Sequence, residues 1–363
     1  MKPCIAVTLG DVTGIGPEVV VKALLDSRVR QCCQPVIYGP SHVIEFVSKK
    51  LAHPLIEIED GPAKMNEVRV RSLGCISQDL IGQGRFSKNT ARLAMDSIVA
   101  AANDASSGKV QALVTAPVHK ESMRRAGFNF IGHTELLAAL THSKNVVMMM
   151  IGPKLKVALV TTHVPVRRIA QEISYEKVLK TISLVHSFWV RHRNQKPRIA
   201  VTSLNPHGGE DRGKEEKEIE RAVRTSQKKG LLVEGPTSSD ALFYRAYRGE
   251  CDVVIAMYHD QGLIPVKMLD FDKTVNMTLG LPFVRTSPDH GTAFDIAGLG
   301  LANPESMIQA IRAAASFHGM NLRTSPAPKI AWQAAGNQTF STRPPKSPPT
   351  SVDERGFTSH RPI

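Results

Sequence analysis

Seven short apolar runs recur along the chain, each rich in β-branched residues and each ending in polar residues, glycine or proline. They span residues 4–11, 35–40, 110–120, 145–152, 155–163, 198–207 and 252–260. Continuous apolar runs of this length, bounded by turn residues, predict strands that are buried on both faces. The pair on either side of Gly152-Pro153 predicts a hairpin.

Between these runs, apolar residues recur at three- and four-residue spacing, which predicts helices. Pro17 stands in the first turn of one of them, where a proline is tolerated. The predicted helices cover residues 16–27, 89–105, 174–190 and 215–230, and Gly230 stops the last one. Strands that alternate with helices predict an α/β fold whose mostly parallel sheet is covered on both faces.

The C-terminal segment, residues 323–363, has a different composition. It carries seven of the 23 prolines and almost no apolar periodicity. Such a segment buries too little surface to offset the entropy of ordering it, so we expect disorder after about residue 325. The expected body, residues 1–322, has the length of two domains or one large α/β unit.

Composition narrows the class of protein. No apolar run approaches 18 residues, so we expect no membrane span. The absence of a signal-peptide pattern and the five cysteines without C-x-x-C spacing favour a cytoplasmic protein. The net charge of +13 raises the alternative of a nucleic-acid-binding protein. The basic residues form no aromatic-interleaved stripe, and a basic surface that attracts small anionic substrates explains the charge as well.

Three predicted strands end in a histidine: His163, His207 and His259. Ligands of open α/β sheets bind outside the carboxyl ends of the strands. Three imidazoles from three such ends predict a catalytic divalent-metal site with open positions, although a lone strand-end histidine is usually structural. Asp260 and Asp240 are candidates for orienting the imidazoles.

Two further segments are candidates for the same cleft. The loop "LGDVTGIGPEV", residues 9–19, is either a tight strand-to-helix turn or a wall of the substrate cleft. It matches neither a dinucleotide-binding nor a P-loop pattern. His133 and Thr134 stand at a predicted helix start, which would bind a carboxylate or phosphate through free N–H groups, unless Thr134 serves only as the N-cap.

Residues 267–311 supply the remaining candidates. Lys267 and Asn276 fall in what looks like a surface loop, whereas Arg285 has apolar neighbours and should have an anionic partner. Farther on, residues 289–291 predict a loop, Thr292 a possible helix start, and Pro304-Glu305 the start of a helix.

The motifs "GDVTGIGPE", "TAPVHK", "GHTELLA", "TTHVPVR", "LNPHGGE", "YHDQGLIPVK", "VNMTLGLPFVRTS" and "DHGTAFDIAG" occur in this order over residues 4–315. Together they resemble the 4-hydroxythreonine-4-phosphate dehydrogenase family of pyridoxal phosphate biosynthesis. The resemblance implies an isopropylmalate dehydrogenase-like fold: two α/β/α subdomains, discontinuous in sequence, with the active-site cleft between them. The run "HGTAFDIAGLGLANP" is also similar to the adenine-binding loop of isopropylmalate and isocitrate dehydrogenases.

The resemblance assigns roles to individual residues. It implies a homodimer whose metal site is shared between subunits, one divalent ion (Zn, Mg or Co) per site, and NAD as the cofactor, with NADP left open. Metal ligands would be His163, His207 and His259, and catalytic residues Lys267 and Asp260. Substrate contacts would be His133, Thr134, Lys267, Asn276 and Arg285, and cofactor contacts His290, Gly291, Thr292 and Asp295.

The implied reaction is oxidation of 4-(phosphooxy)-L-threonine followed by decarboxylation to 3-amino-2-oxopropyl phosphate. A dehydrogenase of threonate or erythronate 4-phosphate is the near alternative, and an aromatic dihydrodiol dehydrogenase a more distant one. The chain departs from the family pattern at Val12 and Thr13, where Pro-Ala is usual, and in its proline-rich tail. We expect Val12 and Thr13 to alter that wall of the cleft.

Overall fold

The computed structural model describes residues 2–59, 61, 63–128, 132–208 and 213–317. All of them belong to one unit, Met1–Ile330. The expected disordered tail, residues 323–363, lies outside the described residues. No helix in the described ranges combines the length and the apolarity that crossing a membrane would require.

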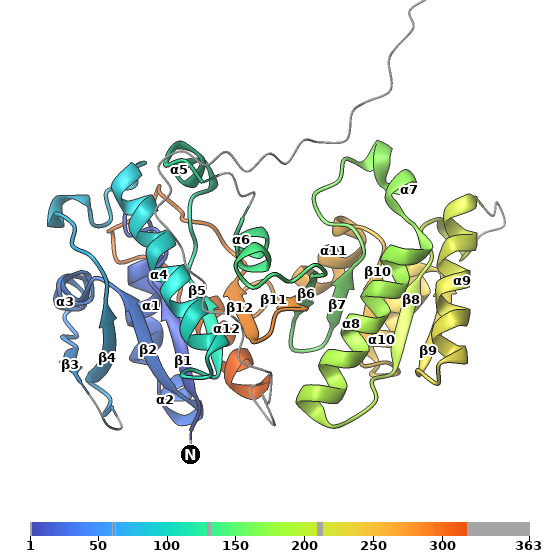
Figure 1. The fold of residues 1–363 in the computed structure, drawn as a ribbon, viewed down its shortest axis with the longest axis horizontal. Coiled ribbons are helices and arrows are strands. Elements are labelled where there is room, and N and C mark those ends of the chain that lie inside the picture. Colours follow the sequence, from blue (N-terminus) through green and yellow to red (C-terminus); the bar gives the residue numbers. More distant parts are fainter. Residues whose placement is uncertain (1, 60, 62, 129–131, 209–212, 318–363) are drawn as a thin grey trace, which may run out of the picture. The chain divides into compact units, whose positions relative to one another are not determined.

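The described strands form one 12-stranded sheet in the order β3-β4-β2-β1-β5-β12-β11-β6-β7-β10-β8-β9, which Figure 1 follows from one end to the other. All seven predicted strands are present: β1 (Cys4–Thr8), β2 (Gln34–Gly39), β5 (Ala112–Thr115), β6 (Val147–Ile151), β7 (Lys156–Leu159), β8 (Ile199–Thr202) and β10 (Val253–Ala256). The sequence patterns missed β3 (Ile56–Ile58), β4 (Glu67–Ser72), β9 (Val233–Thr237), β11 (Val275–Leu279) and β12 (Val284–Pro288).

The four predicted helices are confirmed as α1 (Gly16–Leu24), α4 (Lys88–Ser106), α8 (Tyr175–Arg193) and α9 (Lys214–Lys228). The helix starts expected at His133 and Glu305 are those of α6 (His133–Leu140) and α12 (Glu305–Phe317). The prediction of a helix start at Thr292 is wrong, because residues 292–300 form turns. The other helices are α2 (Ser27–Cys32), α3 (Ser41–Lys50), α5 (Lys120–Arg125), α7 (Ile169–Glu172), α10 (Ser239–Tyr247) and α11 (His259–Leu269), with short 3-10 turns at η1 (Gln78–Leu80), η2 (Val166–Arg168) and η3 (Pro206–Gly208).

The sheet is mostly parallel, with an antiparallel centre. β6 pairs antiparallel with β7, which confirms the predicted hairpin, and also with β11, which pairs antiparallel with β12. The sheet therefore continues without a break through both expected subdomains. Their division into two lobes stays a prediction.

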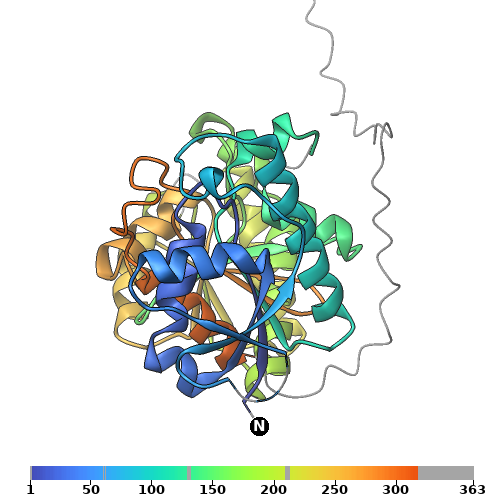
Figure 2. The ribbon, with the colours of Figure 1, turned by 90° about the vertical axis from the view of Figure 1, so that its left-hand side faces the viewer.

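Helices cover both faces of the sheet, as the continuous apolar strands predict. Alternate residues of β1 illustrate this: Ile5 and Val7 belong to the apolar cluster that includes α1 and α12, whereas Ala6 belongs to the cluster that includes α4. Figure 2 shows α1 and α4 on opposite sides of the first strands. Farther along the sheet, α10 and α11 cover the face of β7, β8 and β10.

The strands that end in the candidate metal ligands are neighbours. β10 lies between β7 and β8 and is parallel to both. The carboxyl ends of β7, β10 and β8 therefore meet at one edge of the sheet, as the strand-end argument requires.

Candidate active site

A cavity of about 340 Å³ lies at this edge of the sheet. Strand ends and the starts of α5, α6 and α11 supply its walls. It collects nine of the thirteen candidate residues from distant parts of the sequence: His133, Thr134, His163, His259, Lys267, Asn276, Arg285, His290 and Gly291. His207, Asp260, Thr292 and Asp295 do not line it.

Arg285 is the most unusual residue of the cavity, because its side chain is charged and only 2% of the residue is exposed. It lies on β12, and its guanidinium donates to Thr278 Oγ1 at 3.1 Å and to Thr115 Oγ1 at 2.7 Å. Burial lowers its pKa to about 10, which the charge of Glu135 partly offsets. No described carboxylate forms an ion pair with it, and its Nε has no hydrogen-bond partner there. The cavity therefore holds a buried cation without a carboxylate partner among the described residues, a feature that suits an anionic ligand.

The first turn of α6 faces the same space. Its N-cap is Gly132, in extended conformation, and no side chain accepts from the helix N–H groups. The alternative that Thr134 serves only as the N-cap is therefore wrong; its hydroxyl lies 3.5 Å from that of Thr278. Burial, together with the charges of Arg285 and Lys120, lowers the pKa of His133 to about 3. A neutral His133 and an uncapped helix start are suited to an anion.

His163 and His259 face each other across the cavity, with ring centroids 6.2 Å apart. Backbone bonds from Val160 and Thr161 to the end of β10 extend the pairing of β7 and bring His163 beside His259. The Nδ1 of His259 lies 2.7 Å from Asp260 Oδ1. In the tautomer whose Nδ1–H donates to this carboxylate, the lone pair of Nε2 is available to a metal ion. Burial and the nearby charges of Lys120 and His259 lower the pKa of His163, which also favours a neutral ring.

His207 lies on η3, after β8, in a left-handed backbone conformation with φ of 56°. Its charge contributes to the lowered pKa of Asp240, whose main cause is the backbone N–H of Ala241. The described part of this single chain contains no group of three or more His, Cys, Asp or Glu side chains arranged to hold a metal ion. One chain thus brings two of the three candidate imidazoles together, and His207 is not with them.

Lys267 extends from α11 and forms an ion pair of 2.7 Å with Asp289. Across from it on β11, the Oδ1 of Asn276 is buried and has no hydrogen-bond partner among the described residues. The expectation that Lys267 and Asn276 lie on a surface loop is wrong: they belong to a helix and a strand. Both line the cavity.

Residues 290–295 form the loop beside the cavity. His290 Nε2 is buried without a described partner, and Gly291 has open space where a side chain would stand. Thr292 is buried, and its carbonyl accepts from the backbone N–H of Ile15. Asp295 is exposed. The loop therefore offers two residues to the cavity and is anchored by a third.

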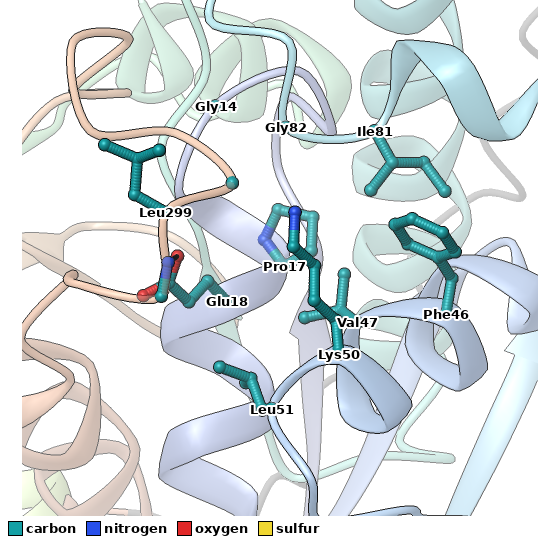
Figure 3. Close-up of a pocket in the computed structure, with 12 residues that line it drawn as sticks. Gly14, Pro17, Glu18, Phe46, Val47, Lys50, Leu51, Ile81, Gly82 and Leu299 are labelled. Carbon is teal, nitrogen blue, oxygen red and sulfur yellow. Dashed lines mark hydrogen bonds between the residues drawn. The ribbon is translucent and has the colours of Figure 1, made fainter.

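A second, smaller cavity of about 90 Å³ lies behind this loop, between α1, α3 and residues 298–300 (Figure 3). Glu18 lines it, but its carboxylate accepts from Lys22 Nζ at 2.8 Å and from the backbone N–H groups of Gly300 and Ala302 at 3.3 and 2.7 Å. Gly14 packs closely against the loop of residues 290–295: a β-carbon there would lie 2.7 Å from the carbonyl oxygen of Thr292. The loop 9–19 thus supports residues 290–302.

This placement favours the tight-turn interpretation of residues 9–19 over a wall of the substrate cleft, because none of them lines the 340 Å³ cavity. Val12 and Thr13 are buried, at 1% and 0% exposure. The Thr13 hydroxyl donates to Asp11 Oδ1 at 2.8 Å. The two departures from the family pattern therefore face the interior of the loop.

Three charged residues of the cavity were not among the candidates: Lys120, Glu135 and Asp289. Lys120 and Glu135 lie in the quoted motifs "TAPVHK" and "GHTELLA", so their charges in those motifs could have marked them as candidates. Asp289 was noted only as part of a loop. Sequence spacing could not show that the starts of α5 and α6 meet.

Comparison with known proteins agrees with this geometry. Residues 31–314 match the model of the family described as "Pyridoxal phosphate biosynthetic protein PdxA". The chain is 42% identical to the 4-hydroxythreonine-4-phosphate dehydrogenase of Desulforapulum autotrophicum, over 86% of this chain and 95% of that protein. It is also 42% identical to the D-threonate 4-phosphate dehydrogenase of Cupriavidus necator, over 87% and 97%.

A solved structure gives the same result. The crystal structure of a 4-hydroxythreonine-4-phosphate dehydrogenase from Burkholderia phymatum superposes with a TM-score of 0.79 at 40% identity, covering 87% of this chain and 98% of that one. The fold, the order of the motifs and these similarities agree over nearly the whole described chain, which belongs to the pyridoxal phosphate biosynthetic protein PdxA family of dehydrogenases.

Proposed function

We propose that the protein oxidises 4-(phosphooxy)-L-threonine and releases carbon dioxide to give 3-amino-2-oxopropyl phosphate, using NAD and a divalent metal ion. The observation that carries the proposal is Arg285, a buried cation without a described carboxylate partner in the same cavity as the facing pair His163 and His259. One end of the cavity thus suits a phosphate and the other a metal-bound alcohol. The names of the relatives support this substrate class.

The phosphate would lie between Arg285 and the first turn of α6. The guanidinium can present two parallel N–H donors to phosphate oxygens, which is stronger than contact with a point charge. The free N–H groups of α6 and the His133 ring add donors. Asn276, whose Oδ1 has no described partner, is positioned to orient the bound substrate.

The facing imidazoles fit a metal ion. A centroid separation of 6.2 Å leaves room for one ion between two rings, since metal–nitrogen bonds measure about 2.1 Å. His163 and His259 would hold it from this chain, and Asp260 would fix the tautomer of His259. When bound, the ion would lower the pKa of the substrate alcohol and stabilise negative charge on its oxygen.

Lys267 is the proposed proton donor or charge stabiliser. Its ammonium lies 2.7 Å from a carboxylate oxygen of Asp289, which orients it. A protonated amine in this position can supply a proton to the carbon that loses carbon dioxide. Asp289 would act through Lys267 rather than on the substrate.

NAD would be held by His290, Gly291, Thr292 and Asp295. The open space at Gly291 and the unpartnered Nε2 of His290 suit a cofactor that reaches the cavity. Buried Thr292 would contribute by fixing the loop. Exposed Asp295 is suited to ribose hydroxyls, which favours NAD over NADP.

We further propose a cytoplasmic homodimer in which the partner's copy of His207 completes the metal site. Exposed apolar side chains cluster on α10, α11 and the residues just after α11, which is unusual for a monomer surface. They are Tyr244, Tyr247, Ile264, Met268, Leu269 and Phe271. Because α11 begins at His259, a second chain bound to this face would stand beside the cavity.

Mixed dimers test the shared site. His163→Ala and His207→Ala chains should each be inactive as homodimers, and co-refolding them should restore up to about a quarter of wild-type activity. That fraction follows from half of the chains pairing as heterodimers with one intact site in each. Equal mixing of His163→Ala with His259→Ala should restore nothing, because both ligands belong to the same chain.

The substrate is tested by following NAD reduction with 4-(phosphooxy)-L-threonine and D-threonate 4-phosphate side by side. The second compound is a true alternative, because a relative of equal identity is named for it. A kcat/KM that favours the amino acid supports the proposal. The reverse preference would reassign the substrate within the same chemistry, and no turnover of either would contradict the phosphorylated class.

A further inference from the structure

We propose that Lys120 is a further phosphate-binding residue, whose ammonium closes the anion subsite formed by Arg285 and the start of α6. The inference deepens the proposed function and rests on it. Lys120 is the first residue of α5 and lines the larger cavity. In the described ranges, its Nζ forms no ion pair or hydrogen bond.

The side chain of Lys120 reaches the start of α6 at Gly132. A β-carbon added at Gly132 would lie 3.9 Å from Lys120 Cε and 3.4 Å from Glu135 Oε2. Both side chains therefore reach the N-cap of α6, within contact distance of Gly132.

The charge of Lys120 acts on a neighbouring side chain of the cavity. It contributes to the lowered pKa of His133 at the proposed phosphate end. Arg285 adds a second cation beside His133. Two cations and an uncapped helix start thus converge on one space.

The neighbouring carboxylates do not neutralise these cations. Asp289 is committed to Lys267. The charge of Glu135 acts on the pKa of Arg285, yet Glu135 forms no described ion pair with either Arg285 or Lys120. A substrate phosphate, which carries nearly two negative charges, would supply the missing charge. Glu135 would repel that phosphate, and the ammonium of Lys120 beside it would offset this repulsion during binding.

Inorganic phosphate provides the direct test, because its binding is measured by titration calorimetry without turnover. Lys120→Gln should weaken phosphate binding by about tenfold to a hundredfold, the range of one charge-assisted contact. Lys120→Arg should retain most of the affinity. Arg125→Gln is the matched control, since Arg125 lies on the same helix, pairs with Glu121 and does not line the cavity. It should change binding by less than twofold.

Kinetics separate binding from a structural role. Lys120→Gln should raise the KM for the phosphorylated substrate more than it lowers kcat, and should reduce the dependence of KM on salt. Binding of unphosphorylated threonate should not change. A loss for threonate equal to the loss for phosphate would assign Lys120 to the substrate carboxylate and overturn the proposal.

The remaining outcomes are distinct. If wild-type protein and Lys120→Gln bind phosphate equally well, the inference about Lys120 fails while the phosphate subsite stands. If wild-type protein binds no phosphate and discriminates against no unphosphorylated substrate, the proposed function itself fails.

Discussion

Replacing Arg285 by methionine should separate stability from function. The side chain is buried, and burial lowers its pKa to about 10. A lowering of this size corresponds to roughly 3 kcal/mol that the folded protein loses by keeping the guanidinium charged near neutral pH, where it is protonated in both the folded and the unfolded state. Methionine fills a similar volume without this cost.

The substitution also removes two hydrogen bonds, to Thr115 and Thr278. Bonds from a charged donor contribute about 1.5 kcal/mol each at the low end of their range. The two effects are of opposite sign and similar size. The free energy of unfolding of Arg285→Met, measured with urea in phosphate-free buffer, should therefore lie within about 1 kcal/mol of wild type.

Catalysis should respond very differently. Loss of a bidentate contact to phosphate removes roughly 3–6 kcal/mol, or about two to four powers of ten in kcat/KM. Arg285→Lys should recover little, because an ammonium lacks the guanidinium fork. Phosphate should raise the melting temperature of wild type and not of Arg285→Met.

The exposed Arg198, which pairs with Asp252 away from the cavity, provides the control as Arg198→Met. It should leave kcat/KM and the effect of phosphate unchanged. A fall in stability of more than about 2 kcal/mol in Arg285→Met, with kcat/KM reduced less than tenfold, would show that the arginine is structural and would refute the reasoning.

Three other regions allow independent tests. The pKa of Cys32 is lowered to about 7, chiefly by a hydrogen bond from Cys33. In a Cys75→Ser background, iodoacetamide should therefore modify Cys32 first, with a rate that rises through about pH 7, and equal labelling of buried Cys33 would contradict this. Glu18→Ala should lower the free energy of unfolding by about 3–5 kcal/mol in urea titrations, because it leaves the N–H groups of Gly300 and Ala302 unpaired and removes the counter-charge of Lys22, which keeps only its two carbonyl acceptors; a loss below 1 kcal/mol would show that the carboxylate is dispensable. Gly14→Ala should raise the KM for NAD while calorimetry shows unchanged phosphate affinity, because its β-carbon would displace Thr292; an unchanged KM would separate this loop from the cofactor.

The strands that the sequence predicts are those buried on both faces by aliphatic residues. β12 escaped prediction because its sequence, Val284–Pro288, is mostly polar, yet all five residues are buried. Thr286 donates to the carbonyl of Ala310, and Arg285 donates to the hydroxyl groups of Thr278 and Thr115. Polar strands of this kind are stabilised by tertiary partners, which local sequence does not reveal.

The start of α11 shows the same limit for helices. The segment after β10 contains Gly262 and Pro265, both unfavourable in a helix interior, and the sequence gives no helical signal there. The structure explains the glycine: a β-carbon at Gly262 would lie 2.7 Å from Leu159 Cδ2 and 2.9 Å from Val157 Cγ1. Only glycine lets α11 pack this closely against β7. The close packing places His259 beside His163.

The sequence predicted the candidate site best where residues able to bind a metal follow directly after a strand. It predicted the site less well where the starts of two helices, distant in sequence, come together. His163 and His259 follow from the position of parallel strands. Lys120 joins the cavity only because α5 and α6 approach each other at Gly132, which no spacing in the sequence indicates.

The two ends of the cavity differ in how complete they are within one chain. The proposed phosphate end has its buried arginine, its helix start and a free lysine in a single chain, whereas the proposed metal end has two imidazoles and lacks His207. If a partner supplies the third ligand, phosphate binding is a property of the chain and turnover a property of the dimer. Substrate could then be recognised before the metal site is complete, and the exposed apolar face of α11 would couple assembly to catalysis. This division would account for the difference between the two ends of the cavity, where Arg285, Lys120 and the start of α6 lie together but only two of the three candidate imidazoles do.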